Sequence, residues 1–436
     1  MNDKNIIENT NLVPLHGLGV DRSSIEIMAP AGSWESLSAA IAAGADSIYF
    51  GIEKLNMRSK SSSNFTTEDL RKIVSICREN NVKSYLTVNT ILYDNDLTLM
   101  REIIDVAKES EVSAIIAADV AALMYARSIG VEVHLSTQLN ISNVEALKFY
   151  AQFADVVVLA RELNMNQVAE IYQSIENEHI NGTSGKPVRI EMFCHGALCM
   201  AVSGKCYLSL HEKNLSANRG ACNQICRREY VVKDKDSEIE LEIDNEYIMS
   251  PKDLKTIGFV DEMLKAGVRV FKIEGRARGA EYVKAVVSCY KEAIESCLEG
   301  TFTDVKIEGW NNRLSKVFNR GFWNGYYLGQ RLGEWSSTYG SAATHKKIYV
   351  GKVTNYFNKL GVAEFLLEAQ SLSVGDEILI TGDTTGAYED IVKEIRVQLQ
   401  PVDKVDKGTY FSIKTSELIR RNDKLFKIVP QNSKGA

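Results

Sequence analysis

The sequence predicts an α/β protein: a (β/α)8, TIM-like barrel with a Cys-rich insertion between strands seven and eight, followed by a small C-terminal antiparallel β-barrel domain. From residue 25 onward, short β-branched runs alternate with stretches in which apolar residues recur every three or four positions. Strands that alternate with helices pair in parallel through right-handed crossovers. After residue 345, short alternating strands broken by Gly, Asn and Asp turns predict the second domain.

Eight candidate strands define the barrel. They are Glu26–Ala29, Ser47–Gly51, Lys83–Val88, Ala114–Ala117, Glu132–Leu135, Asp155–Leu159, Val188–Phe193 and Arg269–Ile273. The segments between them, such as 34–44 and 67–80, have the apolar period of helices packed on a sheet. Eight such units that close on themselves make a barrel, and an open doubly wound sheet is the competing architecture.

The predicted domain organisation has four parts and one insertion. The parts are an N-terminal extension at 1–24, the barrel at 25–305, a linker at 306–345 and the C-terminal domain at 346–436, with the insertion at 194–250. A helical pattern at 251–267 resumes the barrel after the insertion. The insertion should emerge at the carboxyl ends of the strands, where barrel enzymes place their chemistry.

The linker contains a strip, residues 310–333, with four basic and six aromatic residues and no acidic one. One interpretation is an interdomain connection whose rings pack on the barrel. The other is an RNA-facing surface, with cations for phosphates and rings for base stacking. The net charge of −6 provides no global attraction to nucleic acid, so RNA binding would need such a local patch.

Composition and termini predict a cytoplasmic protein. No apolar run approaches the roughly 20 residues that span a bilayer, so no membrane association is expected. The polar, acidic start lacks the basic and apolar regions of a secretion signal. In a reducing compartment, a tight cysteine cluster indicates a metal site more often than disulfides.

Five of the eight cysteines lie between Cys194 and Cys226, in the spacing Cys199-x6-Cys206-x15-Cys222-x3-Cys226 with Cys194 ahead of it. Four thiolates can bind zinc or an iron–sulfur cluster. The long first pair suits a 4Fe–4S cluster better than a zinc knuckle, and zinc stays the alternative. Cys194 is expected to end strand seven, and the three remaining cysteines lie in amphipathic helices, where thiols usually pack in cores.

The segments "EMFCHGALCMAVSGKCYLS" and "NRGACNQICRREY" resemble the signature of peptidase family U32, as do "NMRSKSSSNFT", "HLSTQLNISN" and "FKIEGRARGAEYV". The family was named for collagenase-like proteolysis, but it includes hydroxylases that carry a 4Fe–4S cluster. The chain looks most like the branch that hydroxylates the wobble uridine of tRNA at carbon 5 with prephenate. This resemblance implies that tRNA and prephenate are partners and that Cys199, Cys206, Cys222 and Cys226 hold the cluster.

A prephenate pocket would need cations, because prephenate is a dicarboxylate. Arg58, Lys272, Arg276 and Arg278 lie at predicted strand ends or in the loops after them, and Glu274 shares this rim. Arg276 is the preferred candidate, and its alternative role is a salt bridge to Glu274.

Other candidates could transfer protons or read a base. His134 and His195 are candidate proton-transfer residues, and Glu191 could act as a base or orient a partner. A lone histidine is nevertheless more often structural. The rim amides Asn89, Gln138 and Asn140 suit the reading of a base edge. These are the candidate substrate contacts outside the cluster.

Four functional alternatives stay open beside tRNA hydroxylation. They are a U32-type protease, an rRNA hydroxylase, a hydroxylase of the ubiquinone pathway and a non-catalytic cluster-bearing RNA-binding factor. A protease needs an activated nucleophile or a metal-bound water. The chain has only six histidines and lacks both an H-E-x-x-H zinc motif and a G-x-S-x-G elbow, which disfavours proteolysis.

Overall fold

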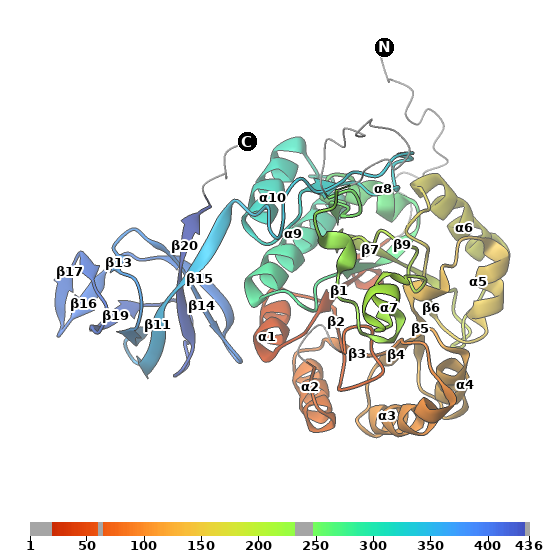
Figure 1. Ribbon diagram of the computed structural model, residues 1–436, viewed down its shortest axis with the longest axis horizontal. Coiled ribbons are helices and arrows are strands. Elements are labelled where there is room, and N and C mark those ends of the chain that lie inside the picture. The colour runs from red at the N-terminus through yellow and green to blue at the C-terminus, as the bar shows by residue number, and fades with distance from the viewer. Residues whose placement is uncertain (1–19, 60–63, 232–246, 432–436) are drawn as a thin grey trace, which may run out of the picture.

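The computed structural model describes residues 20–59, 64–231 and 247–431, and the predicted barrel is confirmed within them (Figure 1). Most of the predicted N-terminal extension, and residues 232–246 of the insertion, lie outside this part of the chain. The barrel strands are β1 Glu26–Pro30, β2 Ser47–Phe50, β3 Lys83–Val88, β4 Ala114–Ala117, β5 Val133–Leu135, β6 Val156–Val158, β7 Arg189–Gly196 and β9 Val268–Ile273. The parallel ladder closes because β9 pairs with both β1 and β7.

Helices follow the strands and form the outer layer of the barrel. They are α1 Trp34–Ala42, α2 Thr67–Glu79, α3 Leu97–Glu109, α4 Val120–Ser128, α5 Val144–Ala151, α6 Met165–Asn177, α8 Val260–Lys265 and α9 Ala280–Leu298. Local signals start them: Ser33 and Thr66 accept hydrogen bonds from the backbone of Ser36 and Asp69, forming capping boxes.

Two separate cores result from the alternation of side chains along each strand. One face of the sheet packs against the helices, with residues such as Ile27, Ile48 and Leu86 fully buried. The other face fills the barrel interior with a smaller cluster around Met28, Tyr49 and Tyr85. The interior is therefore packed with side chains, and a cavity is expected at the carboxyl ends of the strands.

The predicted helix at 251–267 is wrong in its first half. Residues Asp253–Lys255 form β8, which pairs antiparallel with the end of β7 and parallel with β10, Phe322–Trp323. β7 extends to Gly196, so its backbone groups need a partner beyond the barrel, and β8 provides one. The helix α8 begins only at Val260 because this tertiary pairing overrides local helix propensity.

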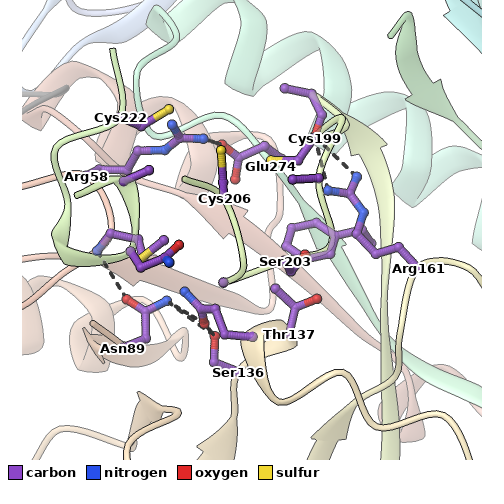
Figure 2. A pocket seen from close by; sticks show the side chains of 18 of the residues that line it. Arg58, Asn89, Ser136, Thr137, Arg161, Cys199, Ser203, Cys206, Cys222 and Glu274 are labelled. Atoms are coloured by element: carbon purple, nitrogen blue, oxygen red, sulfur yellow. Dashed lines mark hydrogen bonds and ion pairs between the residues drawn. The ribbon is translucent and has the colours of Figure 1, made fainter. Parts of the chain in front are cut away.

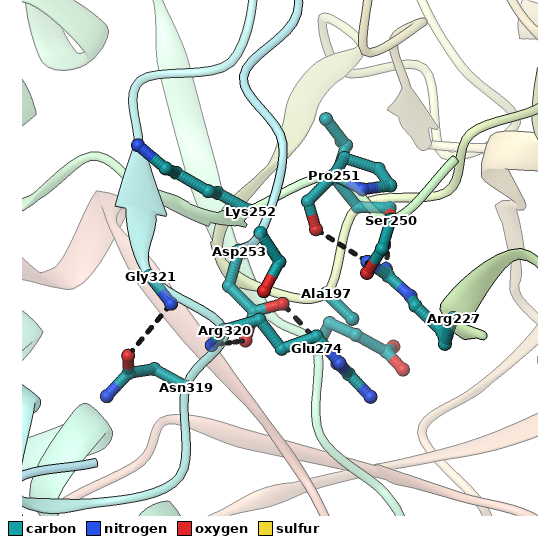
Figure 3. Close-up of polar contacts among 12 residues, drawn as sticks. Ala197, Arg227, Ser250, Pro251, Lys252, Asp253, Glu274, Asn319, Arg320 and Gly321 are labelled. Atoms are coloured by element: carbon teal, nitrogen blue, oxygen red, sulfur yellow. Dashed lines mark hydrogen bonds and ion pairs between the residues drawn. The ribbon is translucent and has the colours of Figure 1, made fainter. Parts of the chain in front are cut away.

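The basic and aromatic strip packs largely on the barrel. It forms the end of α10, Asp304–Lys316, and the short strand β10. Trp310, Trp323 and Tyr327 are buried, which fits the interpretation as an interdomain connection. Arg320 is also turned inward, with an ion pair of 3.5 Å to Asp253 of β8 (Figure 3).

The C-terminal region forms the predicted antiparallel sheet around its own core. Its strands are β11 His345–Phe357, β12 Val362–Leu367, β14 Glu377–Gly382, β15 Gly386–Ile391, β16 Ile395–Val397, β17 Gln400–Val402, β19 Tyr410–Lys414 and β20 Lys424–Pro430, with a separate pair of β13 Leu372–Ser373 and β18 Lys404–Val405. The ladder order β15-β14-β20-β11-β12-β19-β16-β17 places β15 and β17 at its two ends.

The sheet docks on the barrel through small residues. Ala387 and Leu379 pack against Ala39 of α1 and Ala280 of α9 in a buried cluster, and Lys284 donates to the carbonyl of Ala387 at 2.8 Å. Figure 1 shows β14 and β15 beside α1.

Gly386 permits this approach. Its φ is +69°, and a Cβ there would lie 2.6 Å from the amide nitrogen of Ala39. Gly386→Ala should therefore lower the free energy of unfolding by about 2–4 kcal/mol, from left-handed strain plus a backbone clash. Gly375→Ala is the matched control, because Gly375 has φ +92° and open space around it. It should cost only about 1–2 kcal/mol. Equal losses in urea unfolding would contradict the close docking.

Candidate active site at the mouth of the barrel

A cavity of about 170 Å³ opens at the carboxyl ends of the barrel strands, and it is called the mouth pocket below. The loops after β2, β3 and β5, the start of the loop after β9 and the insertion after β7 surround it (Figure 2). Its lining includes all four predicted cluster ligands and six other predicted residues: Cys199, Cys206, Cys222, Cys226, Arg58, Asn89, Gln138, Lys272, Glu274 and Arg276. Residues far apart in sequence thus meet where the barrel rule expects chemistry.

The insertion folds back over the pocket, and close backbone contacts hold it there. Gly220 has φ +83°, and a Cβ at this position would lie 2.5 Å from the carbonyl oxygen of Asn56, in the loop after β2. Arg227 ties the two ends of the insertion together, donating to the carbonyls of Leu198 and Pro251 at 2.5 Å each (Figure 3). The segment that carries Cys222 and Cys226 is therefore fixed on both sides.

The four cysteines predicted to bind the cluster are more exposed to solvent than the other four cysteines of the chain. Cys199 is exposed, and Cys206, Cys222 and Cys226 are partly exposed, all as free thiols. Burial raises the pKa of Cys226, Arg227 opposes this, and the negative charge of the other three thiolates raises it further. The sulfurs are thus near enough to interact electrostatically. Within the described residues, no three His, Cys, Asp or Glu side chains surround a single point as ligands of one metal ion would.

The other four thiols are structural. Cys194 lies in the last part of β7, which continues to Gly196, and it donates to the carbonyl of Lys272 at 3.4 Å. Cys77, Cys289 and Cys297 are buried in helices, and burial raises the pKa of each to about 12. These side chains pack in cores as the sequence predicts.

Arg58 and Glu274 form an ion pair of 2.6 Å at the wall of the mouth pocket. Burial alone would raise the pKa of Glu274, but the attraction of Arg58 and, more weakly, of Arg276 holds it below the ordinary value. Tyr49 adds a long hydrogen bond of 3.4 Å to the same carboxylate. Glu274 is therefore an anion whose partner is Arg58, not Arg276 as the alternative interpretation had it.

Arg276 is 6% exposed and donates only to neutral groups, the Asn56 amide oxygen at 3.2 Å and the Thr87 hydroxyl at 3.0 Å. It makes no ion pair with any described residue. Burial lowers its pKa to about 10, so it stays a cation at neutral pH. A buried positive charge that faces a cavity and has no ion-pair contact with a described residue is a site that favours an anion.

The rim amides form a small polar network on the opposite wall. Asn89 donates to the Ser136 hydroxyl at 3.3 Å and to Gln138 at 3.4 Å, and Ser136 also donates to Gln138. Asn140 donates to the carbonyl of Ser203 at 3.0 Å and thereby supports the insertion instead of lining the pocket. Arg278 lies over the ring of Phe318 at 3.5 Å, also away from the pocket.

His134, Glu191 and His195 do not line the mouth pocket. His134 and Glu191 lie deeper in the barrel interior, both buried. His195 faces the helix layer, with Tyr282 and Tyr290 of α9 around it, because the β7–β9 register shifts between Phe193 and His195. Burial, helped by Lys255, lowers the pKa of His195 to about 3. The imidazole is therefore neutral and has no direct access to the cavity.

Sequence reasoning missed Arg161. This residue follows β6, stacks on Phe193 with 4.5 Å from its guanidinium to the ring centroid, and donates to the carbonyl of Ala197. It lines both the mouth pocket and a neighbouring cavity of about 250 Å³ on the other side of residues 199–203. The position of Arg161 shortly after a barrel strand could have indicated that it belongs to the site.

The sequence profile of Peptidase family U32 matches residues 32–337. The chain belongs to this family. A protein of Porphyromonas gingivalis named "Collagenase" is 66% identical over 405 residues, 93% of this chain and 98% of the relative. The "tRNA hydroxylation protein P1" of Bacillus subtilis is 31% identical over 381 residues, 84% of this chain and 86% of the relative. A 23S rRNA 5-hydroxycytidine synthase of Escherichia coli is 33% identical over 281 residues, 64% of this chain and 41% of the relative.

These U32 relatives carry names from two classes of chemistry, proteolysis and RNA hydroxylation. Family membership therefore leaves the reaction open, and the residues of the mouth pocket must decide between them. No described helix has the length and apolar character needed to cross a membrane.

Alkylation of the metal-free protein tests the two classes of cysteine. At pH 8, iodoacetamide should modify Cys199, Cys206, Cys222 and Cys226 first, because they are accessible, and the thiolate is the reactive form. Cys77, Cys289 and Cys297, with pKa values near 12, should react at least tenfold more slowly until the protein is unfolded. Peptide mass spectrometry measures each rate. Equal labelling of both classes would contradict the described packing.

Proposed function

We propose that this U32 protein is an iron–sulfur-dependent enzyme that hydroxylates the wobble uridine of tRNA at carbon 5, with prephenate as co-substrate. The observation that carries the proposal is the mouth pocket, which combines four partly exposed thiols with a buried arginine that has no anionic partner among the described residues. Thiols suit a soft metal cofactor, and the arginine suits an anionic substrate.

The donor set fits a 4Fe–4S cluster. All four thiols line one cavity, which has no histidine among its described lining residues, and the backbone of Gly204 also lines it. A single zinc ion is the alternative, because four thiolates can also bind zinc. When bound, such a cluster supplies electron transfer, and the protein's own residues hold the substrates beside it.

A dicarboxylate such as prephenate would find two cations in the same wall. Arg276 presents a planar guanidinium without a counterion, and Arg58 is held in place by Glu274. A carboxylate at Arg276 would neutralise a buried charge, which is the strongest electrostatic gain the pocket offers. Arg161 and Lys272 add positive charge on the neighbouring walls.

A uridine from a single-stranded loop could reach the pocket with its base splayed out. Asn89 and Gln138 present amide groups that can donate to and accept from the polar edge of a pyrimidine. The chain's acidic balance means that phosphate contacts must come from local cations at the mouth.

Proteolysis is the second candidate, because the relative named "Collagenase" is 66% identical. The pocket offers little support for it. None of the described residues that line the mouth pocket is a histidine, and Ser136 is hydrogen-bonded to amides without a general base. Hydrolysis of denatured collagen by pure protein, lost in Cys199→Ser and in Ser136→Ala, would favour this candidate.

Anaerobic reconstitution tests the cofactor. The protein should bind about four iron and four sulfide per chain, as a 4Fe–4S cluster requires. Cys226→Ala should lose most of this iron, because it removes one of four ligands. Cys194→Ala is the matched control, since Cys194 is buried outside the pocket, and it should retain the full content. Stoichiometric zinc without sulfide, or equal loss in both variants, would contradict the cluster.

Arg276→Gln tests the reaction. The reconstituted protein, incubated with tRNA and prephenate, should form 5-hydroxyuridine detectable by nucleoside mass spectrometry. Arg276→Gln should reduce product at least 100-fold with unchanged iron content, because a charge-assisted contact worth about 3 kcal/mol is lost. Arg278→Gln removes a nearby arginine that stacks on Phe318 outside the pocket, and it should retain activity. Normal product from Arg276→Gln would remove this residue from the site.

A further inference from the structure

A line of ionisable side chains runs through the barrel interior beneath the mouth pocket. Lys272, which lines the pocket, donates to Oε1 of Glu191 at 2.6 Å. The other oxygen of Glu191, Oε2, lies 3.9 Å from Nδ1 of His134. The remaining ring nitrogen, Nε2, lies 3.3 Å from the carboxylate of Glu132. These four residues are called the interior chain below.

The middle of the interior chain contains two buried atoms without partners. His134 is 1% exposed and Glu191 is fully buried, and neither Nδ1 nor Oε2 has a hydrogen-bond partner among the described residues. In the tautomer in which Nε2 donates to the Glu132 carboxylate, Nδ1 presents a lone pair to a carboxylate oxygen. Two facing acceptors are unfavourable, at about 1–3 kcal/mol for each unsatisfied group. Because 3.9 Å is too long for a direct hydrogen bond, a water that donates to both atoms relieves this cost.

The two ends of the interior chain lie at opposite ends of the barrel. Lys272 and Glu274 mark the carboxyl end of β9, where the pocket is. Glu132 directly precedes β5 and its side chain is 49% exposed at the amino end. The interior chain therefore connects the mouth pocket with solvent on the far side of the protein.

We propose that the interior chain is a proton relay between the mouth pocket and the opposite face of the barrel. The Lys272 ammonium gives a proton to Glu191, the carboxyl group passes it to Nδ1 of His134 through a water that bridges the 3.9 Å gap, and Nε2 releases its own proton to Glu132 and solvent. Lys272, now a neutral amine, takes up a proton released in the pocket. One proton moves outward, and His134 is left with its own proton on Nδ1, so a flip of the ring must return this proton to the Glu132 side before the next transfer. The proposed function supplies that proton, because hydroxylation at carbon 5 replaces a hydrogen there.

An aromatic ring and two carboxylates surround the imidazole of His134. The ring of Tyr85 lies 4.4 Å away, and the carboxylates of Glu26 and Asp155 act on the imidazole electrostatically. Burial alone would raise the pKa of Glu26, but Lys83 and Arg189, with a hydrogen bond from Tyr85, lower it to about 2. Glu26 is therefore a fixed anion near the ring, and it does not compete for the proton.

The first test needs no enzymatic activity. Histidine is labelled with 15N in the imidazole ring, and spectra are recorded for the holoprotein and for Glu191→Gln, Lys272→Met and Tyr85→Phe. The relay predicts that Lys272→Met alters the Nδ1 signal of His134, although no contact joins the two side chains, and that Glu191→Gln converts Nδ1 into an ordinary acceptor. Tyr85→Phe, which alters a ring neighbour outside the relay, should leave the protonation pattern unchanged. Nδ1 signals that are identical in the holoprotein and both relay variants would overturn the proposal.

The second test separates proton transfer from packing. In single-turnover hydroxylation, His134→Gly should be at least tenfold slower and should recover with added imidazole, which can occupy the vacated space and carry the proton. His134→Gln, which fills the space without a titratable group, should be slow and stay so. Thermal unfolding checks that each variant is folded. Wild-type rates in folded His134→Gln would overturn the relay. Absence of hydroxylation in the wild-type protein would instead refute the proposed function, and the NMR result would still decide the relay.

Discussion

Closure of the parallel sheet at β9 is the constraint on which the rest of the structure depends. β9 pairs with β1 on one side and β7 on the other, so both ends of the cysteine insertion are tied to the barrel wall. Parallel strands place all their carboxyl ends at one rim. Arg58 after β2, Arg276 after β9 and the thiols after β7 therefore meet, although more than 200 residues separate the first from the second.

The mouth of this barrel holds more positive charge than its own carboxylates neutralise. Glu274 is paired with Arg58, and Arg276 is left with the neutral partners Asn56 and Thr87. Burying a cation that makes no ion pair costs free energy of folding, and the tight packing elsewhere in the barrel offsets this cost. An anionic substrate bound beside Arg276 would provide the missing ion-pair partner. The thiols also fit a binding role, because partly exposed cysteines around a cavity contribute little to packing.

Much of the barrel and of the mouth pocket could be predicted from the sequence, because strands and helices follow periodic patterns and the site follows from where the strands end. All eight barrel strands follow from alternating patterns, and the gathering of the four cysteines with Arg58, Lys272, Glu274 and Arg276 follows from where parallel strands end. The failures are local. A one-residue register shift in β7 turns His195 toward α9, and β8 exists only because β7 extends past the barrel. Neither effect leaves a trace in composition or spacing, since both arise from long-range pairing.

The U32 family relatives are named for either proteolysis or RNA hydroxylation, and one pocket must account for the reaction of this chain. Nucleoside mass spectrometry of total tRNA, from a strain lacking the gene and from the same strain carrying it again, tests the central claim most directly. The account predicts that 5-hydroxyuridine and its derivatives disappear in the first strain and return in the second. Unchanged levels of these nucleosides in the strain without the gene would contradict it.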